Sequence, residues 1–196
     1  MGWKKTSLLK REQQENTQCS NEPFEVYKDR FTGPSSPLRI KDAYRYVEEV
    51  LINLDGSLLV VGSGHGDHCN TFLTRCPNIS ITASDILIEA RAHLDSKIHF
   101  ICLDLLFEQF KNKFDYVISI HTLEHFTKID LFNTVWPNLV NAANRAVITI
   151  VPYAMAWSDE PSHKCYFYED DEFAVLQDRY KIIFGEQEIV YWKSII

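Results

Sequence analysis

A glycine-rich turn that follows an apolar run is the clearest candidate for a ligand-binding site. Residues Leu58–Asp67 read LLVVGSGHGD. The apolar residues are typical of a parallel strand that is buried on both faces. The glycines of Gly62-Ser63-Gly64-His65-Gly66 permit a tight turn and leave no Cβ in the way of a ligand. Asp67 is suited to cap a following helix. Strand, turn and helix together predict a nucleotide-binding corner.

The glycine spacing excludes two common kinds of nucleotide site. It is G-x-G-x-G, not the G-x-G-x-x-G of dinucleotide enzymes, and no Lys-Ser/Thr pair of a P-loop follows. A nicotinamide-dependent oxidoreductase is therefore disfavoured. Asp85 lies 23 residues after Gly62, close to the spacing expected for an acid that binds ribose hydroxyls.

A second group of residues could transfer protons or bind a metal. His121-Thr122-Leu123-Glu124-His125 places His121, Glu124 and His125 on one face of a helical turn. His163 lies in a later loop. Each of these histidines is a candidate general base, because imidazole titrates near neutral pH. All four residues could instead bind a divalent metal. We favour a role in bracing the loop over metal binding, which stays the alternative.

Strands and helices alternate along most of the chain, which predicts a parallel sheet covered by helices. A helix opens at Pro37, with Ile40, Tyr44, Val47, Val50 and Leu51 on its apolar face. After the glycine turn, the pattern predicts helices at Asp67–Arg75, Ile88–Leu94, Ile129–Ala142 and Glu169–Arg179, and strands at Ile79–Ser84, Ile98–Leu103, Tyr116–Ile120 and Ala146–Val151. Lys181–Gly185 and Glu188–Trp192 are predicted to form a hairpin.

From about Ser57 to its end, the chain resembles the class I S-adenosylmethionine-dependent methyltransferases of the small-molecule type. The glycine turn matches their first motif, which reads roughly LDxGxGxG, and HTLEHF resembles their "xxLEH" segment after strand four. One departure is Val60, which stands where the family usually has an acid. The resemblance implies an α/β, Rossmann-like three-layer sandwich whose mostly parallel seven-stranded sheet ends in an antiparallel hairpin.

The resemblance also implies S-adenosyl-L-methionine as the cofactor. Asp85 would bind both ribose hydroxyls. Asp104 would accept a hydrogen bond from the exocyclic amine of the adenine, with Leu105 packed nearby. The residues expected to bind the cofactor are Gly62, Ser63, Gly64, Asp85, Ile86, Asp104, Leu105 and His121.

The resemblance further places the substrate under two segments rich in aromatic residues. Residues 1–36 are expected to form an N-terminal arm or lid, with Tyr27 and Arg30 as substrate contacts, and residues 37–196 a single methyltransferase domain. The loop Pro152–Phe167 would line the substrate pocket through Tyr153 and Trp157. Ordinary surface or core packing is the alternative for all four residues.

Composition limits the range of partners. The 196-residue chain has a formal net charge of −7, whereas a protein that binds a nucleic-acid backbone usually presents a basic face. Nucleic acid is therefore an unlikely partner, and a small-molecule substrate is favoured. No apolar run reaches the length of a membrane span. Five cysteines without paired spacing and no signal-peptide pattern indicate a cytoplasmic protein. The oligomeric state stays open.

These observations predict an enzyme that transfers a methyl group to an oxygen or nitrogen of a small metabolite, such as a sugar or a biosynthetic intermediate. His163, His125 and His121 are the candidate catalytic residues. Two alternatives remain. A similar segment binds a divalent metal in the methyltransferases that modify the 2′ hydroxyl of the 3′-terminal ribose of small RNAs, which suggests a metal-assisted RNA enzyme. Val60 suggests a non-catalytic member.

Overall fold

Seven strands form a single sheet in the computed structural model, which describes residues 40–156, 160–183 and 187–195, with side chains from Arg45 onward. The strand order is β3-β2-β1-β4-β5-β7-β6. The strands are β1 (Gly56–Val61), β2 (Ile79–Asp85), β3 (His99–Cys102), β4 (Phe114–Ile120), β5 (Ala143–Pro152), β6 (Arg179–Ile183) and β7 (Glu188–Ser194). The first five are parallel, and β7 pairs antiparallel with both β5 and β6. The predicted mostly parallel sheet with a terminal hairpin is confirmed.

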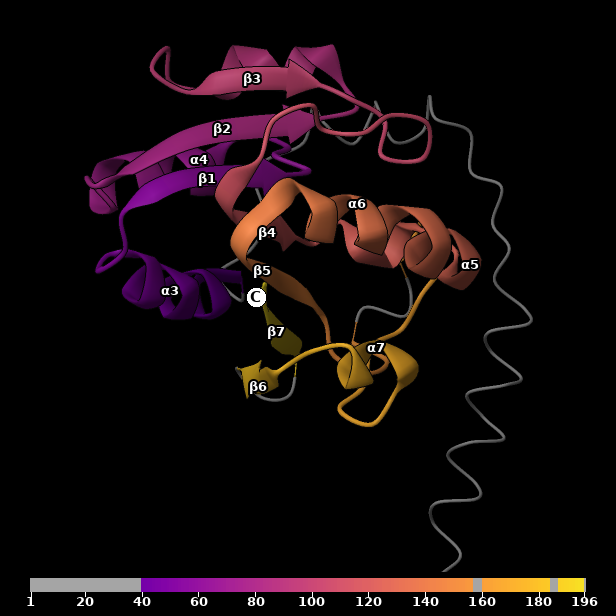
Figure 1. Cartoon of the computed structure of the whole chain (residues 1–196). Coiled ribbons are helices and arrows are strands. Elements are labelled where there is room, and N and C mark those ends of the chain that lie inside the picture. The colour runs from indigo at the N-terminus through magenta and orange to yellow at the C-terminus, as the bar shows by residue number, and fades with distance from the viewer. Residues whose placement is uncertain (1–39, 157–159, 184–186, 196) are drawn as a thin grey trace, which may run out of the picture.

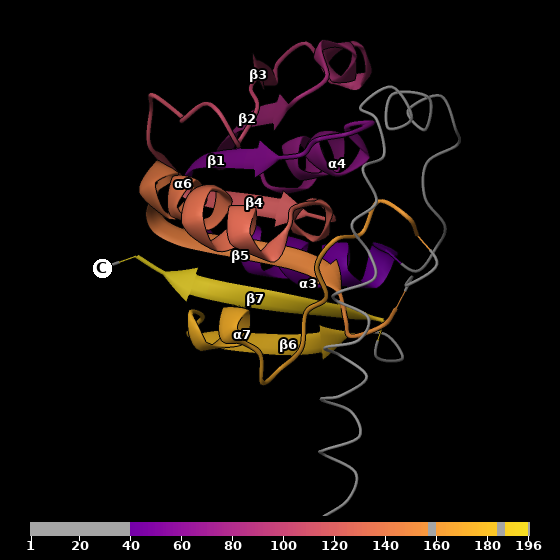
Figure 2. The same cartoon turned by 90° about the vertical axis from the view of Figure 1, so that its right-hand side faces the viewer.

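Helices cover both faces of this sheet (Figures 1 and 2). On one face, α3 (Ile40–Leu51) and α4 (Asp67–Arg75) pack their apolar side chains against β1, β2 and β4. On the other face, the π-helical turn η3 (Leu131–Val135), α6 (Trp136–Ala142) and α7 (Glu172–Val175) enclose a second core, rich in aromatic residues. The predicted three-layer sandwich is confirmed.

The helix after the glycine turn has the predicted bounds, Asp67–Arg75, but its cap differs from the prediction. Gly66, at φ 74°, occupies the cap position of α4, and Asp67 is the first helical residue. Asp67 therefore does not cap the helix through its side chain. Its carboxylate instead lies in the first turn, where the helix dipole favours negative charge. Arg75 in the last turn pairs with Glu48 of α3 at 2.8 Å, which joins the two helices on this face.

Three predicted helices differ in the structure. The predicted helix Ile88–Leu94 is a 3-10 helix, η1 (Ile88–His93). The predicted helix Ile129–Ala142 consists of α5 (Lys128–Asp130), η3 and α6. Pro137 near the start of α6 cannot donate a backbone hydrogen bond, so a regular α-helix cannot run through it.

The predicted helix Glu169–Arg179 is wrong over most of its length. Asp171 caps α7 by accepting a hydrogen bond from the Ala174 N–H at 2.7 Å, and α7 spans only Glu172–Val175. Arg179 already belongs to β6, where it pairs with Trp192 of β7. Its guanidinium lies over the Trp192 ring, 4.7 Å from the centroid. Contacts with β7, which helix propensity does not describe, therefore determine the conformation at Arg179.

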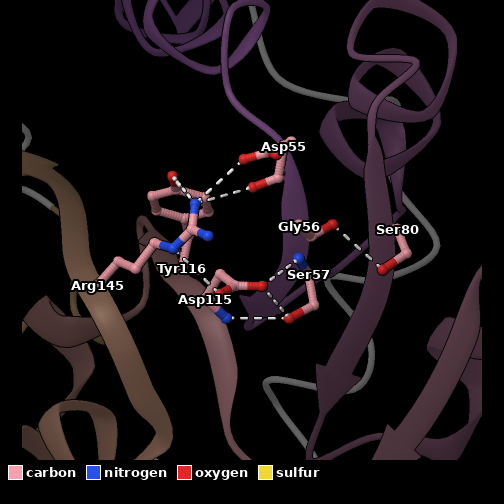
Figure 3. A network of polar contacts seen from close by, with 7 residues as sticks. All are labelled: Asp55, Gly56, Ser57, Ser80, Asp115, Tyr116 and Arg145. Carbon is pink, nitrogen blue, oxygen red and sulfur yellow. Dashed lines mark hydrogen bonds and ion pairs between the residues drawn. The ribbon is translucent and has the colours of Figure 1, made fainter.

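A polar network closes the edge of the sheet at which β1 and β4 begin (Figure 3). Asp115 Oδ2 accepts hydrogen bonds from the N–H and hydroxyl of Ser57, at 2.8 and 3.0 Å. Asp115 Oδ1 lies 3.2 Å from Arg145 Nε. Arg145 Nη1 also contacts Asp55 and the Tyr116 hydroxyl. The network joins the starts of β1, β4 and β5, and we call it the amino-edge network.

Some sequence predictions lie outside the described residues. They include the arm at residues 1–36, with Tyr27 and Arg30, and also Trp157. Among the helices that the structure describes, none has both the length and the apolar character needed to cross a membrane.

Candidate functional site

A cavity of about 280 Å³ lies where the parallel strands end. It is surrounded by the loops that follow β1, β2, β3 and β4 and by the segment around residue 163. The carboxyl ends of parallel strands are the usual place for ligands in open α/β sheets. Its lining residues are Val61, Gly62, Ser84, Asp85, Ile86, Leu103, Asp104, Leu105, Leu106, Thr122, His125, Phe126, Ser162 and Lys164.

Gly62, the first residue of the glycine turn, lines this cavity. Gly62 has φ 70° and Gly64 φ 51°, a backbone region that side chains disfavour. The amides of Gly62 and Ser63 both donate to the Ser84 carbonyl, at 2.8 and 3.0 Å, and hold the turn against β2. A Cβ at Gly62 would collide with the side chain of Thr122. Glycine is therefore required there by both conformation and space.

Val60 in β1 and Ser63 in the turn do not line the cavity. Ser63 is fully buried. Val60 is also fully buried and belongs to the core under α3 and α4. Where the resembling family usually has an acid, this chain therefore has a packing residue.

Asp85 holds the glycine turn and also lines the cavity. Its Oδ2 accepts from the Gly64 N–H at 2.9 Å, and its Oδ1 accepts from the Leu87 N–H at 3.0 Å. Burial raises the pKa of Asp85, and the Leu87 and Gly64 amides oppose this rise. A carboxylate oxygen can accept more than one hydrogen bond. Asp85 thus has acceptor capacity left for a ligand hydroxyl.

Asp104 lies at the end of β3 on the same cavity. Its Oδ1 accepts from the Leu106 N–H at 2.9 Å, so the side chain forms a local turn. Leu105 is buried, whereas Ile86 is exposed at the cavity's rim. Of the eight residues predicted to bind the cofactor, five line the cavity. They are Gly62, Asp85, Ile86, Asp104 and Leu105.

His121 lies between two buried carboxylates and outside the cavity lining. Its Nε2 is 2.9 Å from Glu188 Oε1, and its Nδ1 is 3.4 Å from Glu124 Oε1. Burial opposes protonation of His121, but the adjacent carboxylates of Glu124 and Glu188 outweigh burial and raise its pKa to about 9. Burial likewise opposes ionisation of Glu124, yet the adjacent His121 imidazole lowers the pKa of Glu124. This pair is therefore ionic at neutral pH.

The loop that carries His163 is fixed to the turn that carries Glu124. The amides of Lys164 and Cys165 both donate to the Glu124 carbonyl, at 2.7 and 3.1 Å. His163 is only 4% exposed, and its Nε2 lies 4.0 Å from Glu124 Oε1. Burial lowers the pKa of His163, which keeps its imidazole neutral.

His125 is the histidine of this group that lines the cavity. Its Nδ1 lies 3.2 Å from the Ser162 carbonyl oxygen. Because a carbonyl only accepts hydrogen bonds, neutral His125 carries its proton on Nδ1, and Nε2 is its basic nitrogen. The rings of His125 and His163 pack edge to face, with centroids 5.3 Å apart.

Glu124, His125 and His163 form a candidate cation site. Each offers one ligand atom, and these three atoms lie within 4.8 Å of one another. These three residues could hold a cation.

Tyr153 does not line this cavity. Its hydroxyl donates to Glu169, and its amide donates to the Gln187 carbonyl.

Other candidate functional residues were not predicted from the sequence. Thr122, Phe126, Ser162 and Lys164 line the cavity, and Glu188 binds His121. Thr122 and Phe126 belong to the HTLEHF segment, which could have indicated them, whereas no local signal marks Glu188.

Comparison with known proteins gives structural matches only. No family's sequence profile matches the chain, and no curated protein does. NodS from Bradyrhizobium japonicum WM9, an N-methyltransferase in complex with S-adenosyl-L-homocysteine, is 12% identical; the match covers 93% of this chain and 96% of NodS, with a TM-score of 0.64.

Two further solved structures match similarly. Magnesium protoporphyrin IX methyltransferase (ChlM) from Synechocystis PCC 6803, with bound S-adenosyl-L-homocysteine, is 16% identical over 87% of this chain and 93% of ChlM, with a TM-score of 0.65. The methyltransferase domain of a bacterial Hen1, CtHen1, is 16% identical over 78% of this chain and 97% of that domain, with a TM-score of 0.62. This chain therefore has the fold of the class I S-adenosylmethionine-dependent methyltransferases.

Proposed function

We propose that this protein binds S-adenosyl-L-methionine in the cavity at the ends of β1, β2 and β3 and transfers its methyl group to an oxygen or nitrogen of a small metabolite. The observation that carries this proposal is the convergence of Gly62, Asp85 and Asp104 on one cavity. These residues follow three different strands, and each was predicted for the cofactor from its place in the sequence. NodS and ChlM, whose fold is shared, were solved with the demethylated cofactor.

The residues present fit this cofactor. Gly62 lines the cavity without a side chain, so a ligand can approach the backbone of the turn. Asp85 retains acceptor capacity for ribose hydroxyls, and Asp104 offers a carboxylate beside the apolar wall of Leu105. A polar acceptor beside an apolar wall suits an adenine ring, which is flat and carries an exocyclic amine.

The bound cofactor would supply a methyl group already activated as a sulfonium. The protein must then align the acceptor, exclude water and, for a hydroxyl or an ammonium acceptor, remove a proton. Of the three candidate histidines, His125 is best placed for this last task, because it lines the cavity and its tautomer leaves Nε2 basic. His163 lies behind His125, and its burial favours a role in orienting that ring.

The lining on the side of β4 favours a small acceptor. Thr122, His125, Phe126, Ser162 and Lys164 combine an aromatic surface with hydroxyl groups and one exposed cation. Such a mixed lining suits a compact polar metabolite. The net charge of −7 argues further against a nucleic-acid acceptor.

A metal-assisted reaction is the second candidate, because ligand atoms of Glu124, His125 and His163 lie within 4.8 Å of one another. This set would be the site of a divalent cation, with imidazole and carboxylate ligands. His121, the fourth residue predicted for this site, directs both ring nitrogens at carboxylates. If a metal is required, methyl transfer will be lost in a chelator and restored by the cation.

A pair of matched variants tests the cofactor site. Asp104 and Asp95 each accept a hydrogen bond from the amide two residues ahead, both at 2.9 Å, but only Asp104 lines the cavity. Both alanine variants lose the same local turn. Calorimetry should show that Asp104→Ala weakens binding of S-adenosyl-L-homocysteine about tenfold, the value of one lost hydrogen bond to a charged group. Asp95→Ala should bind like the unchanged protein. Equal affinities of the two variants would place the ligand elsewhere.

A further inference from the structure

Glu188 is a buried acid that the proposed chemistry does not use. It opens β7, opposite Pro152 of β5, and is 0% exposed. Its Oε1 contacts His121 Nε2 at 2.9 Å across 67 residues of sequence. Its Oε2 is buried, and no hydrogen-bond partner lies among the residues that the structure describes. Burying a carboxylate in this way costs free energy, so its retention requires an explanation.

His121 is held in a backbone conformation that non-glycine residues rarely adopt. Its φ is 48°, and its amide donates to the Ile150 carbonyl at 2.8 Å. Such a conformation persists only where surrounding contacts maintain it. The His121 side chain contacts Glu188 on β7 and Glu124 three residues ahead. Together they hold the ring from two sides.

The segment that follows His121 forms one wall of the cavity. Thr122, His125 and Phe126 line it, and the Glu124 carbonyl anchors the amides of Lys164 and Cys165 in the facing loop. A change in the backbone at His121 would therefore move both loops. The chain of contacts runs from Glu188 through His121 to Glu124 and from there to the loop that carries His163.

We propose that Glu188 is a positioning residue, which fixes the strained backbone at His121 and thereby the 121–126 wall of the cavity. The proposal rests on the proposed function only in calling this cavity the active site. Glu188 should fix the 121–126 segment even when the chain has no ligand bound.

Amide hydrogen exchange of the full chain, without ligand, tests this dependence. We compare Glu188→Leu, which removes the acceptor for His121, with Glu188→Gln, which retains one. The control is Asp171→Asn, which alters a carboxylate bonded to the amides of Tyr168 and Ala174. Exchange at residues 121–126 should be at least about tenfold faster in Glu188→Leu, and less accelerated in Glu188→Gln. The Asp171→Asn variant should leave this segment unchanged.

Two results would overturn the proposal. One is exchange in Glu188→Leu that rises equally in 121–126 and in the interiors of β1 and β4, because that reports global destabilisation. The other is a 121–126 segment as protected in Glu188→Leu as in the unchanged protein. If the leucine variant does not fold, the same result in Glu188→Gln overturns the proposal, because glutamine keeps an acceptor but loses the charge that attracts protonated His121. Binding of S-adenosyl-L-homocysteine to the unchanged protein, measured separately, distinguishes failure of this proposal from failure of the proposed function.

Discussion

The two ends of the sheet use similar polar residues in different ways. In the amino-edge network, both oxygens of Asp115 have partners, and the Arg145 side chain is half exposed (Figure 3). At the carboxyl ends, Glu124 and Glu188 are 1% and 0% exposed, and each has one buried oxygen without a hydrogen-bond partner in the described part of the chain. Satisfied, partly hydrated carboxylates stabilise a fold, whereas buried and incompletely paired ones reduce its stability. The comparison indicates that the amino edge serves architecture and the carboxyl edge serves chemistry.

Two glycines, one at each end, test this division most strongly. Gly56 and Gly62 both have positive φ, and an added Cβ would meet Asp115 at Gly56 and Thr122 at Gly62. Either alanine variant should lower the free energy of unfolding by about 1–3 kcal/mol. Only Gly62→Ala should weaken S-adenosyl-L-homocysteine binding, by about 100-fold, because only that Cβ would displace a side chain of the cavity lining, Thr122. Urea unfolding measures the loss of stability, and calorimetry measures the loss of affinity. An equal loss of affinity in Gly56→Ala would contradict the separate roles of the two ends.

The ion pair at the carboxyl end predicts a dependence of stability on pH. The pKa of folded His121 is about 9, above the ordinary 6.5, so its contribution is complete below pH 6.5 and is lost as pH rises through 9. The free energy of unfolding of the unchanged protein, relative to His121→Gln, should fall by about 3 kcal/mol across this window. Chemical denaturation at a series of pH values measures it. The exposed His99, changed to Gln, is the control; an equal difference for both variants would contradict the ion pair.

The amino-edge network should contribute to stability without affecting the ligand. Asp115→Ala leaves the Ser57 amide without its acceptor and should cost about 1–2 kcal/mol of unfolding free energy. Affinity for S-adenosyl-L-homocysteine should remain within twofold, because the network lies at the opposite end of the strands. Thermal unfolding with and without ligand separates the two quantities, and a large loss of affinity would show that the edges are coupled.

Arg145→Ala should have the smallest effect. The Arg145 side chain is 51% exposed, and ion pairs in water contribute little. Its unfolding midpoint in urea should shift less than that of Asp115→Ala. A larger shift would mean that the guanidinium, and not the Ser57–Asp115 contact, holds this edge together.

The sequence predicted the cavity residues near β1, β2 and β3 better than those near β4 and residue 163, for a physical reason. Gly62, Asp85 and Asp104 lie at or just after the carboxyl ends of strands, and parallel strands bring these ends together wherever the alternating pattern is clear. Glu188 meets His121 only through the antiparallel register of β5 and β7, which no local pattern encodes. Tyr153 was predicted in the pocket from the aromatic character of its loop, yet its hydroxyl turns to Glu169. Arg179 was wrongly predicted to lie in a helix. Its conformation depends on pairing with β7, which is also distant in the sequence.

Calorimetric titration of the full chain with S-adenosyl-L-methionine, with and without added divalent metal, tests the central claim most directly. We expect binding at one site with a dissociation constant of roughly micromolar order, the same in a chelator as in added metal. Binding that requires the metal would favour the Glu124, His125 and His163 site as part of the reaction. No binding of either S-adenosyl-L-methionine or its demethylated product would contradict the proposed function.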